Sequence, residues 1–150
     1  ECLVGSEMCI RDRNVRDWLF VEDHAKAIDM VQEQGRLFET YNVGGHNEKQ
    51  NIEIINIIID TLQEMLPADD PRRALVSKDL ITYVEDRKGH DRRYAIAPDK
   101  IKAEIGWYPE TDFATGIKKT IAWFFEHEDW MKNVTSGDYQ KYYDDMYANK

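Results

Sequence analysis

Three short segments typical of β-strands alternate with longer stretches of helical periodicity, and this pattern limits the folds open to the chain. The strand-like segments, rich in aromatic or β-branched residues, are 15–21, 39–43 and 80–85. Apolar residues recur at helical spacing in 24–34, 52–66, 99–104 and 112–126. Alternating strands and helices indicate an α/β fold. Because three short strands are too few for a complete doubly wound sheet, we expect one part of a larger α/β protein.

The helix boundaries are predicted from capping residues. Asp23 offers a side-chain oxygen suited to an N-cap, and Gly35 fits the position after a helix end. Gln50 or Asn51 is expected to cap the helix over 52–66. Pro98 fits the first helical position of the segment over 99–104. Segment 44–47 predicts a turn, 67–71 a loop, and 139–147 a weaker, aromatic-rich helix.

Composition excludes several functional classes. The chain of 150 residues has a formal net charge of -9, which argues against a general nucleic-acid binder, since that function needs a basic face. No apolar run approaches the roughly 20 residues of a membrane-spanning helix. The only cysteines, Cys2 and Cys9, have neither metal-ligand spacing nor a disulfide framework, so no metal site is predicted and a reducing cytoplasm is expected.

Residues 1–13 differ from the rest of the chain, because they show no sustained periodicity and hold both cysteines. We interpret 1–13 as a non-native leader and 14–150 as the domain proper. The alternative is an ordinary N-terminal strand and turn. Trp107, Trp123 and Trp130 are expected to pack in the core or against another domain.

A cationic stretch, DRKGHDRRY at 86–94, stands out in this acidic chain. It follows the third strand-like segment and contains a glycine. Guanidinium groups on a loop suit phosphate, because the planar fork can bond two oxygens at once. On charge alone, a solvated surface loop is the better interpretation.

No glycine-rich G-x-x-G-x-x-G fingerprint follows a strand in this sequence. That fingerprint lets the backbone approach the pyrophosphate of a dinucleotide. The chain is therefore not expected to bind a dinucleotide in the Rossmann manner.

Several motifs resemble a known family when they are taken together and in order. They are RDWLFVEDHA (16–25), YNVGGHNE (41–48) and DRKGHDRRYAI (86–96), followed by 105–107, 116–117 and 120–123. The chain resembles the C-terminal portion of the dTDP-glucose 4,6-dehydratases, a family of extended short-chain dehydrogenases. The similarity runs from about Asn14 to near the end of the chain.

The resemblance implies a nucleotide-sugar-binding domain with few short strands and several helices, without its Rossmann half. Members of the family are NAD-dependent lyases that oxidise C4 of the sugar, eliminate water across C5 and C6, and return the hydride to C6. Their NAD site and catalytic residues belong to the N-terminal domain. This chain is therefore expected to carry no catalytic residue and to be inactive alone, although the full-length enzyme would bind NAD and dTDP-glucose.

The resemblance also assigns substrate-binding residues. Arg16 aligns with an arginine on the diphosphate side of the substrate; the alternative is a strand-edge arginine paired with Asp17 or Glu22. Asn51 aligns with an asparagine that hydrogen-bonds the substrate, whereas a helix N-cap is the better reading from the sequence alone.

The cationic stretch aligns with a family loop that closes on the diphosphate. Its expected substrate-binding residues are Asp86, Arg87, Lys88, Gly89 and His90. Arg87 is the principal phosphate partner, Gly89 allows close backbone approach, and His90 either donates to the substrate or makes a structural bond within the loop. The family usually has proline where this chain has Lys88, so the loop is expected to be less rigid.

Two other functions stay open at this stage. One is a related UDP-sugar epimerase or decarboxylase on the same fold, and the other is a non-catalytic nucleotide-sugar-binding module. The family commonly forms homodimers, chiefly through helices of the N-terminal domain, so a homodimer is expected only of the full-length enzyme.

Overall fold

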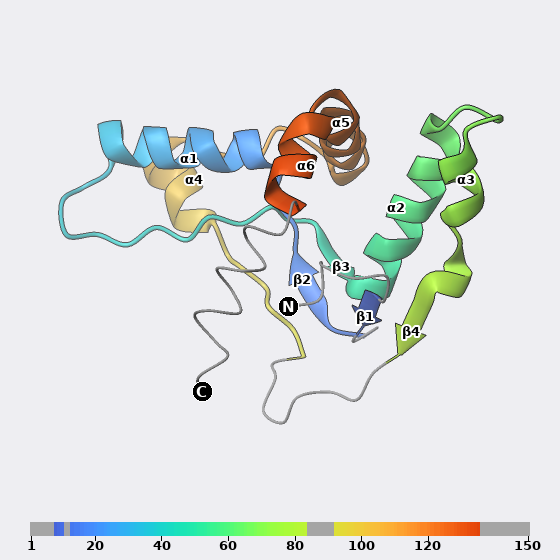
Figure 1. Ribbon diagram of the computed structural model, residues 1–150. Helices are drawn as coiled ribbons and strands as arrows, with labels where there is room; N and C mark the ends of the chain where they lie inside the picture. Colours follow the sequence, from blue (N-terminus) through green and yellow to red (C-terminus); the bar gives the residue numbers. More distant parts are fainter. Residues whose placement is uncertain (1–7, 11–12, 84–91, 136–150) are drawn as a thin grey trace, which may run out of the picture. The chain divides into compact units, whose positions relative to one another are not determined.

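The computed structural model describes residues 8–10, 13–83 and 92–135 (Figure 1). The chain divides into two compact units, a first unit over 1–117 and a second unit over 118–150. In the first unit lie helices α1 (Val21–Gln34), α2 (Asn51–Met65), α3 (Pro71–Leu75) and α4 (Asp99–Ile105), with a 3-10 turn at Lys78–Leu80. Helix α5 (Phe113–Glu126) begins in the first unit and ends in the second, which also holds α6 (Glu128–Thr135).

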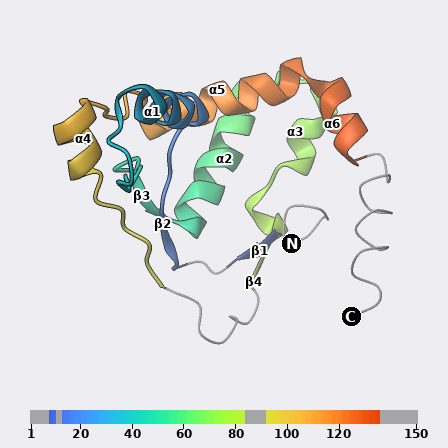
Figure 2. The ribbon, with the colours of Figure 1, turned by 90° about the vertical axis from the view of Figure 1, so that its left-hand side faces the viewer.

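The described strands form two small sheets in the first unit. Strand β1 (Met8–Ile10) pairs in parallel with β4 (Ile81–Tyr83). Strand β2 (Val15–Asp17) pairs antiparallel with β3 (Glu48–Gln50), directly before α2 (Figures 1 and 2). A strand at Met8–Ile10 matches the alternative proposed for the N-terminus, while the interpretation of 1–13 as a non-native leader stays a prediction.

The main core of the first unit lies between α1 and α4. Ala27 from α1 is buried against Ile101, Ile105 and Trp107. Trp107 is 1% exposed, and its indole N–H donates to the carbonyl of Asp23 at 3.1 Å. This burial confirms the prediction for Trp107, whereas Trp123 and Trp130 in the second unit are 40% and 49% exposed.

Helix α2 builds a second cluster. Its amphipathic pattern buries Ile55 and Ile59, against which Ile52, Val76 and Ile81 pack. The backbone N–H of Gln50, the N-cap, donates to Oε2 of Glu53 at 2.6 Å. The predicted helix is thus confirmed, with Gln50 as the cap and Asn51 as the first helical residue.

The predicted start of α1 is wrong, whereas its predicted end is confirmed. The helix begins at Val21, so Asp23 lies inside its first turn instead of capping it. The Asp23 carboxylate accepts the backbone N–H of Thr111 at 2.9 Å, a long-range bond that replaces the capping role. Gly35 follows the last helical residue, Gln34, as predicted, and its φ of -67 is extended.

The strand predicted over 39–43 is also wrong, since no strand is assigned there. Its polar groups bond to α4 instead of to a sheet. Lys100 donates to the carbonyl of Thr40 at 3.0 Å and to Glu39 at 2.6 Å, and the Tyr41 hydroxyl contacts Glu104 at 2.9 Å.

Smaller differences concern the other element ends. Strand β2 stops at Asp17 and α4 takes Pro98 as its N-cap, not its first residue. Gly106 ends α4 with φ 78, as a terminating glycine does. Helices α3 and α6 were not predicted, and the helix expected over 139–147 lies outside the described residues.

Glu104 should make the stability of the first unit depend on acid pH. Hydrogen bonds from Tyr41 and Arg36 hold the pKa of Glu104 below its ordinary value of 4.5. A carboxyl group whose pKa is lower in the folded state stabilises the fold at pH values above its unfolded-state pKa. This stabilisation is lost as the pH falls through the folded-state pKa. Glu104→Gln should therefore flatten the acid limb of a urea-midpoint profile measured from about pH 7 to about pH 3. An acid limb as steep as that of the unmodified chain would contradict this role.

Candidate functional site

The paired strands β2 and β3 bring two predicted site residues to the same place. In their register Arg16 opposes Lys49, and opposed residues of an antiparallel pair share a face of the sheet. The backbone N–H of Asn51 donates to the carbonyl of Asn14 at 3.0 Å, which extends the pairing to the start of α2. Arg16 and Asn51 therefore lie near each other although they are distant in sequence.

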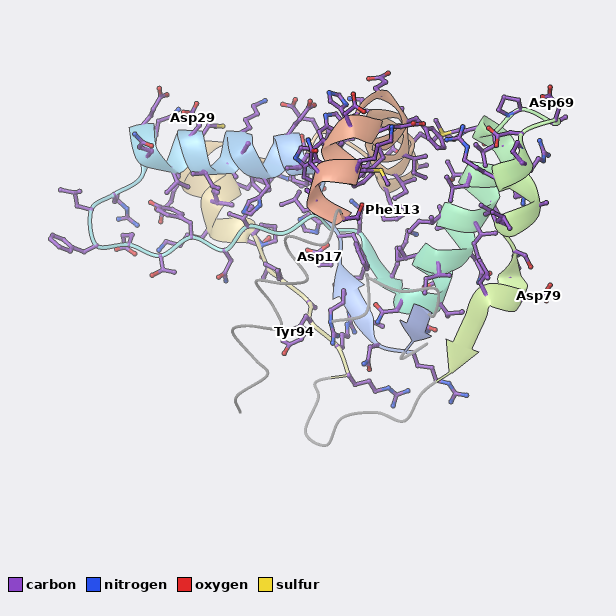
Figure 3. The ribbon with its side chains drawn as sticks, in the orientation of Figure 1. Asp17, Asp29, Asp69, Asp79, Tyr94 and Phe113 are labelled. Atoms are coloured by element: carbon purple, nitrogen blue, oxygen red, sulfur yellow. The ribbon has the colours of Figure 1, made fainter. Side chains whose placement is uncertain are left out.

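The segment that follows the cationic loop joins this pair from the other side. Val15 donates to the carbonyl of Arg92 at 2.9 Å, and Tyr94 donates to the carbonyl of Val15 at 3.1 Å. Val15 and Arg93 thereby form a parallel bridge. Figure 3 labels Tyr94 on this segment, beside β2.

The Arg16 side chain is half-buried and oriented by two contacts. Its Nη1 donates to the carbonyl of Val15 at 2.8 Å, and its Cζ lies 4.5 Å from the centroid of the Tyr94 ring. The N–H groups of a guanidinium lie in its own plane, so a ring over its central carbon does not stand in the direction in which they donate. An arginine held in this way suits a phosphate or carboxylate ligand.

Asp17 fixes the turn that leads into β3. Its Oδ2 accepts the N–H of Gly45 at 2.7 Å and its Oδ1 accepts the N–H of Asn47 at 2.9 Å. The chain bends at His46, which has φ 52, so the predicted turn over 44–47 is confirmed. A Cβ on Gly45 would lie 2.2 Å from the carbonyl oxygen of Trp18, so this close approach requires glycine.

Several cations gather on these strands despite the acidic chain. Lys49 lies opposite Arg16, and Arg92 and Arg93 lie on the parallel segment. Arg93 forms an ion pair with Glu48 of β3. Lys49 contributes to the face of Arg16, and its ammonium lies 5.5 Å from the centroid of the Phe113 ring.

The remaining predicted residues, Asp86, Arg87, Lys88, Gly89 and His90, lie outside the described residues. The described chain locates the two ends of their segment, at β4 on one side and at Arg92 on the other. Lys49 and Tyr94 were missed as site residues. Lys49 could have been found from its pairing with Arg16, but that pairing depends on strand β3, which the sequence analysis did not predict.

Within the part of the chain that the structure describes, no cluster of three histidine, cysteine, aspartate or glutamate side chains could hold a metal ion. Likewise, none of the helices described has the length and apolar character needed to cross a bilayer.

A comparison with models of protein families shows the family to which the chain belongs. The model of the family described as GDP-mannose 4,6 dehydratase matches residues 4–120, well over half of the sequence. The chain belongs to this dehydratase family. The match begins inside the segment interpreted as a leader.

Named relatives of this dehydratase family narrow the resemblance. A dTDP-glucose 4,6-dehydratase of Shigella flexneri is 48% identical over 136 residues, which are 91% of this chain and 36% of that protein. The chain thus spans little more than a third of the relatives that it matches. The predicted resemblance to dTDP-glucose 4,6-dehydratases is confirmed at the level of sequence.

Solved structures of the same dehydratases confirm the fold class. The dTDP-glucose 4,6-dehydratase of Bacillus anthracis in complex with NAD is 41% identical with a TM-score of 0.68, over 83% of this chain and 36% of that one. The Streptomyces venezuelae enzyme, also with NAD bound, is 34% identical with a TM-score of 0.68, over 81% and 34%. The expectation of a partial extended short-chain dehydrogenase, helix-rich with few strands, is therefore correct.

Proposed function

We propose that this chain is the nucleotide-sugar-binding portion of a dTDP-glucose 4,6-dehydratase. The complete protein would convert dTDP-glucose to dTDP-4-keto-6-deoxyglucose and water. The observation that carries the proposal is the 48% identity to a named dTDP-glucose 4,6-dehydratase over 91% of the chain. The geometry of β2 and β3 supports it, because their pairing brings the strand of Arg16 to the start of α2 at Asn51, with Arg92 and Arg93 on the neighbouring segment.

In this proposal Arg16 binds the diphosphate and Asn51 hydrogen-bonds the substrate. A diphosphate needs cationic partners, preferably forked ones, and the Arg16 guanidinium presents such donors. The Asn51 amide both donates and accepts, so it suits the hydroxyl or carbonyl groups of a nucleotide sugar. Asp86, Arg87, Lys88, Gly89 and His90 complete the binding set, with Arg87 as the principal cation of the loop.

NAD is the cofactor of the complete protein in this proposal, and the residues of this chain do not fit its site. The sequence has no glycine-rich fingerprint after a strand. We therefore assign NAD and the hydride chemistry to a part of the complete protein that this chain does not include. This chain's residues bind and orient the nucleotide sugar, with no proton or hydride step of their own.

The 150-residue chain alone is expected to show no turnover of dTDP-glucose, because the proposal leaves it without NAD or a catalytic residue. The measurement is product formation by mass spectrometry in the presence of NAD. Any turnover above a heat-treated sample would contradict the assignment of the chemistry to another part of the protein.

Nucleotide selectivity tests the substrate class. In calorimetric titrations of the complete protein, dTDP should bind more tightly than UDP or GDP. A preference for UDP would favour the related epimerase or decarboxylase. A preference for GDP would favour a GDP-mannose 4,6 dehydratase, the activity named in the family's description. Selective dTDP binding without any turnover would favour a non-catalytic binding module.

The complete protein is proposed to be cytoplasmic and homodimeric. A nucleotide-sugar enzyme of this kind fits the cytoplasm, and the cysteine usage of this chain agrees with a reducing compartment. A homodimer is proposed for the complete protein, to be checked by its mass in solution.

A further inference from the structure

The backbone of Tyr94 is fixed to the strand that carries Arg16. Its N–H donates to the carbonyl of Val15 at 3.1 Å, while Val15 donates to Arg92 at 2.9 Å. These bonds flank the parallel bridge between Val15 and Arg93. The Cα of Tyr94 is therefore held in register with the residue next to Arg16.

A second link holds the same segment to β3. Arg93 forms an ion pair with Glu48, which opposes Asp17 in the register of β2 and β3. Asp17 in turn accepts two backbone N–H groups of the turn before β3. The segment 92–94 is thus tied to both strands of the site.

The Tyr94 ring then limits what the Arg16 side chain can do. The ring centroid lies 4.5 Å from Cζ, and Nη1 is bonded to the carbonyl of Val15 at 2.8 Å. The ring contacts the guanidinium through its aromatic face, and the guanidinium donors lie in the plane of the guanidinium itself. An arginine is a long, flexible side chain, so holding it in advance reduces the entropy lost when it binds an anion.

We propose that Tyr94 is a positioning residue that holds the Arg16 guanidinium in the orientation that binds the substrate diphosphate. This inference rests on the proposed function, since it needs Arg16 to contact the diphosphate. Tyr94 itself is not assigned a substrate contact. Its aromatic face carries the role, and its hydroxyl does not.

The test uses the complete protein and titrates dTDP by calorimetry. Tyr94→Leu removes the aromatic face and should weaken dTDP binding about three- to tenfold, the range expected from losing an exposed cation–π contact and one preorganised side chain. Tyr94→Phe keeps the face and should bind dTDP as the unmodified protein does. Tyr94→Gln gives a second replacement without an aromatic face if the leucine variant does not fold.

Tyr108 provides a matched control. It is 45% exposed against 48% for Tyr94, and it also stacks under a cation, with the Lys102 ammonium 4.6 Å from its ring centroid. Tyr108→Leu should leave dTDP affinity unchanged. A loss equal to that of Tyr94→Leu would show a general effect of removing surface tyrosines and would overturn the proposal.

A double-mutant cycle separates positioning from a direct contact. In an Arg16→Ala background Tyr94→Leu should cause no further loss, because its effect passes through Arg16. An undiminished loss in that background, or an unchanged affinity of Tyr94→Leu where Arg16→Ala is clearly weakened, would overturn the positioning role alone. If Arg16→Ala itself leaves dTDP binding unchanged, the diphosphate role of Arg16 fails, and this inference fails with it.

Discussion

Arg16→Ala is expected to weaken dTDP-glucose binding by the complete protein about ten- to a hundredfold. Hydrogen bonds to charged groups contribute about 1.5–3 kcal/mol, and about 1.4 kcal/mol corresponds to a tenfold change in affinity. The expected loss is large because Arg16 is already held by Tyr94 and by the carbonyl of Val15, so little ordering remains to be done on binding. The measurement is a calorimetric titration at fixed ionic strength.

Two further variants sharpen the interpretation of Arg16→Ala. Arg16→Lys keeps the charge but loses the planar fork, so its affinity for dTDP-glucose should lie between those of the unmodified protein and of Arg16→Ala. Arg36→Ala removes an arginine that pairs with Glu104 on another part of the first unit, and should leave affinity unchanged. Equal losses of dTDP-glucose affinity in Arg16→Ala and Arg36→Ala would show that the loss comes from the change in net charge, and would contradict a binding role for Arg16.

Trp107→Ala is expected to destabilise the first unit by about 3–5 kcal/mol, the usual range for removing a buried aromatic side chain. The indole is 1% exposed, packs in the cluster with Ala27 and Ile101, and donates to the carbonyl of Asp23 at 3.1 Å. Because many domains are stable by only about 5–15 kcal/mol, this variant should be partly unfolded or close to it. Urea unfolding followed by circular dichroism measures the change.

Trp107→Phe and Trp130→Ala are the controls for this prediction. Trp107→Phe keeps most of the apolar contact but loses the N–H donor, so it should be less damaging than Trp107→Ala. Trp130 is 49% exposed, and its removal should change stability far less. Similar losses in Trp107→Ala and Trp130→Ala would contradict the placement of the core between α1 and α4.

Elements with a strong local pattern were predictable from the sequence. Helix α2 repeats isoleucine at helical spacing, so its existence and its ends were predicted to within a residue. The end of α4 also has a local signal, because Gly106 adopts φ 78 there and a left-handed helix terminus favours glycine. Strand β3 was missed because Glu48–Gln50 is short and polar, and only its register with β2 makes it a strand.

The errors arose where a distant partner overrides a local preference. Asp23 has the chemistry of a cap, but Thr111 takes its carboxylate. Segment 39–43 has a strand-like composition, but its bonds run to Lys100 and to Glu104. The stack of Tyr94 on Arg16 is of the same kind, since only the fold brings these two residues together.

At the candidate site, the sequence supplied the residue types and the family resemblance, and the fold supplied the proximity. Arg16 and Asn51 were named from motifs, while their shared position depends on the pairing of β2 with β3. The roles of Arg16, Asn51 and the loop over 86–90 stay predictions.

The most direct test of the central claim is to express the complete coding sequence that contains this chain and to incubate the protein with dTDP-glucose and NAD. We expect a product lighter than the substrate by one water, with a keto group at C4 and a methyl group at C6. We also expect Arg16→Ala to need a higher substrate concentration for the same rate. A complete, folded protein that binds NAD but leaves dTDP-glucose unchanged, while converting a UDP-sugar or GDP-mannose, would contradict the account.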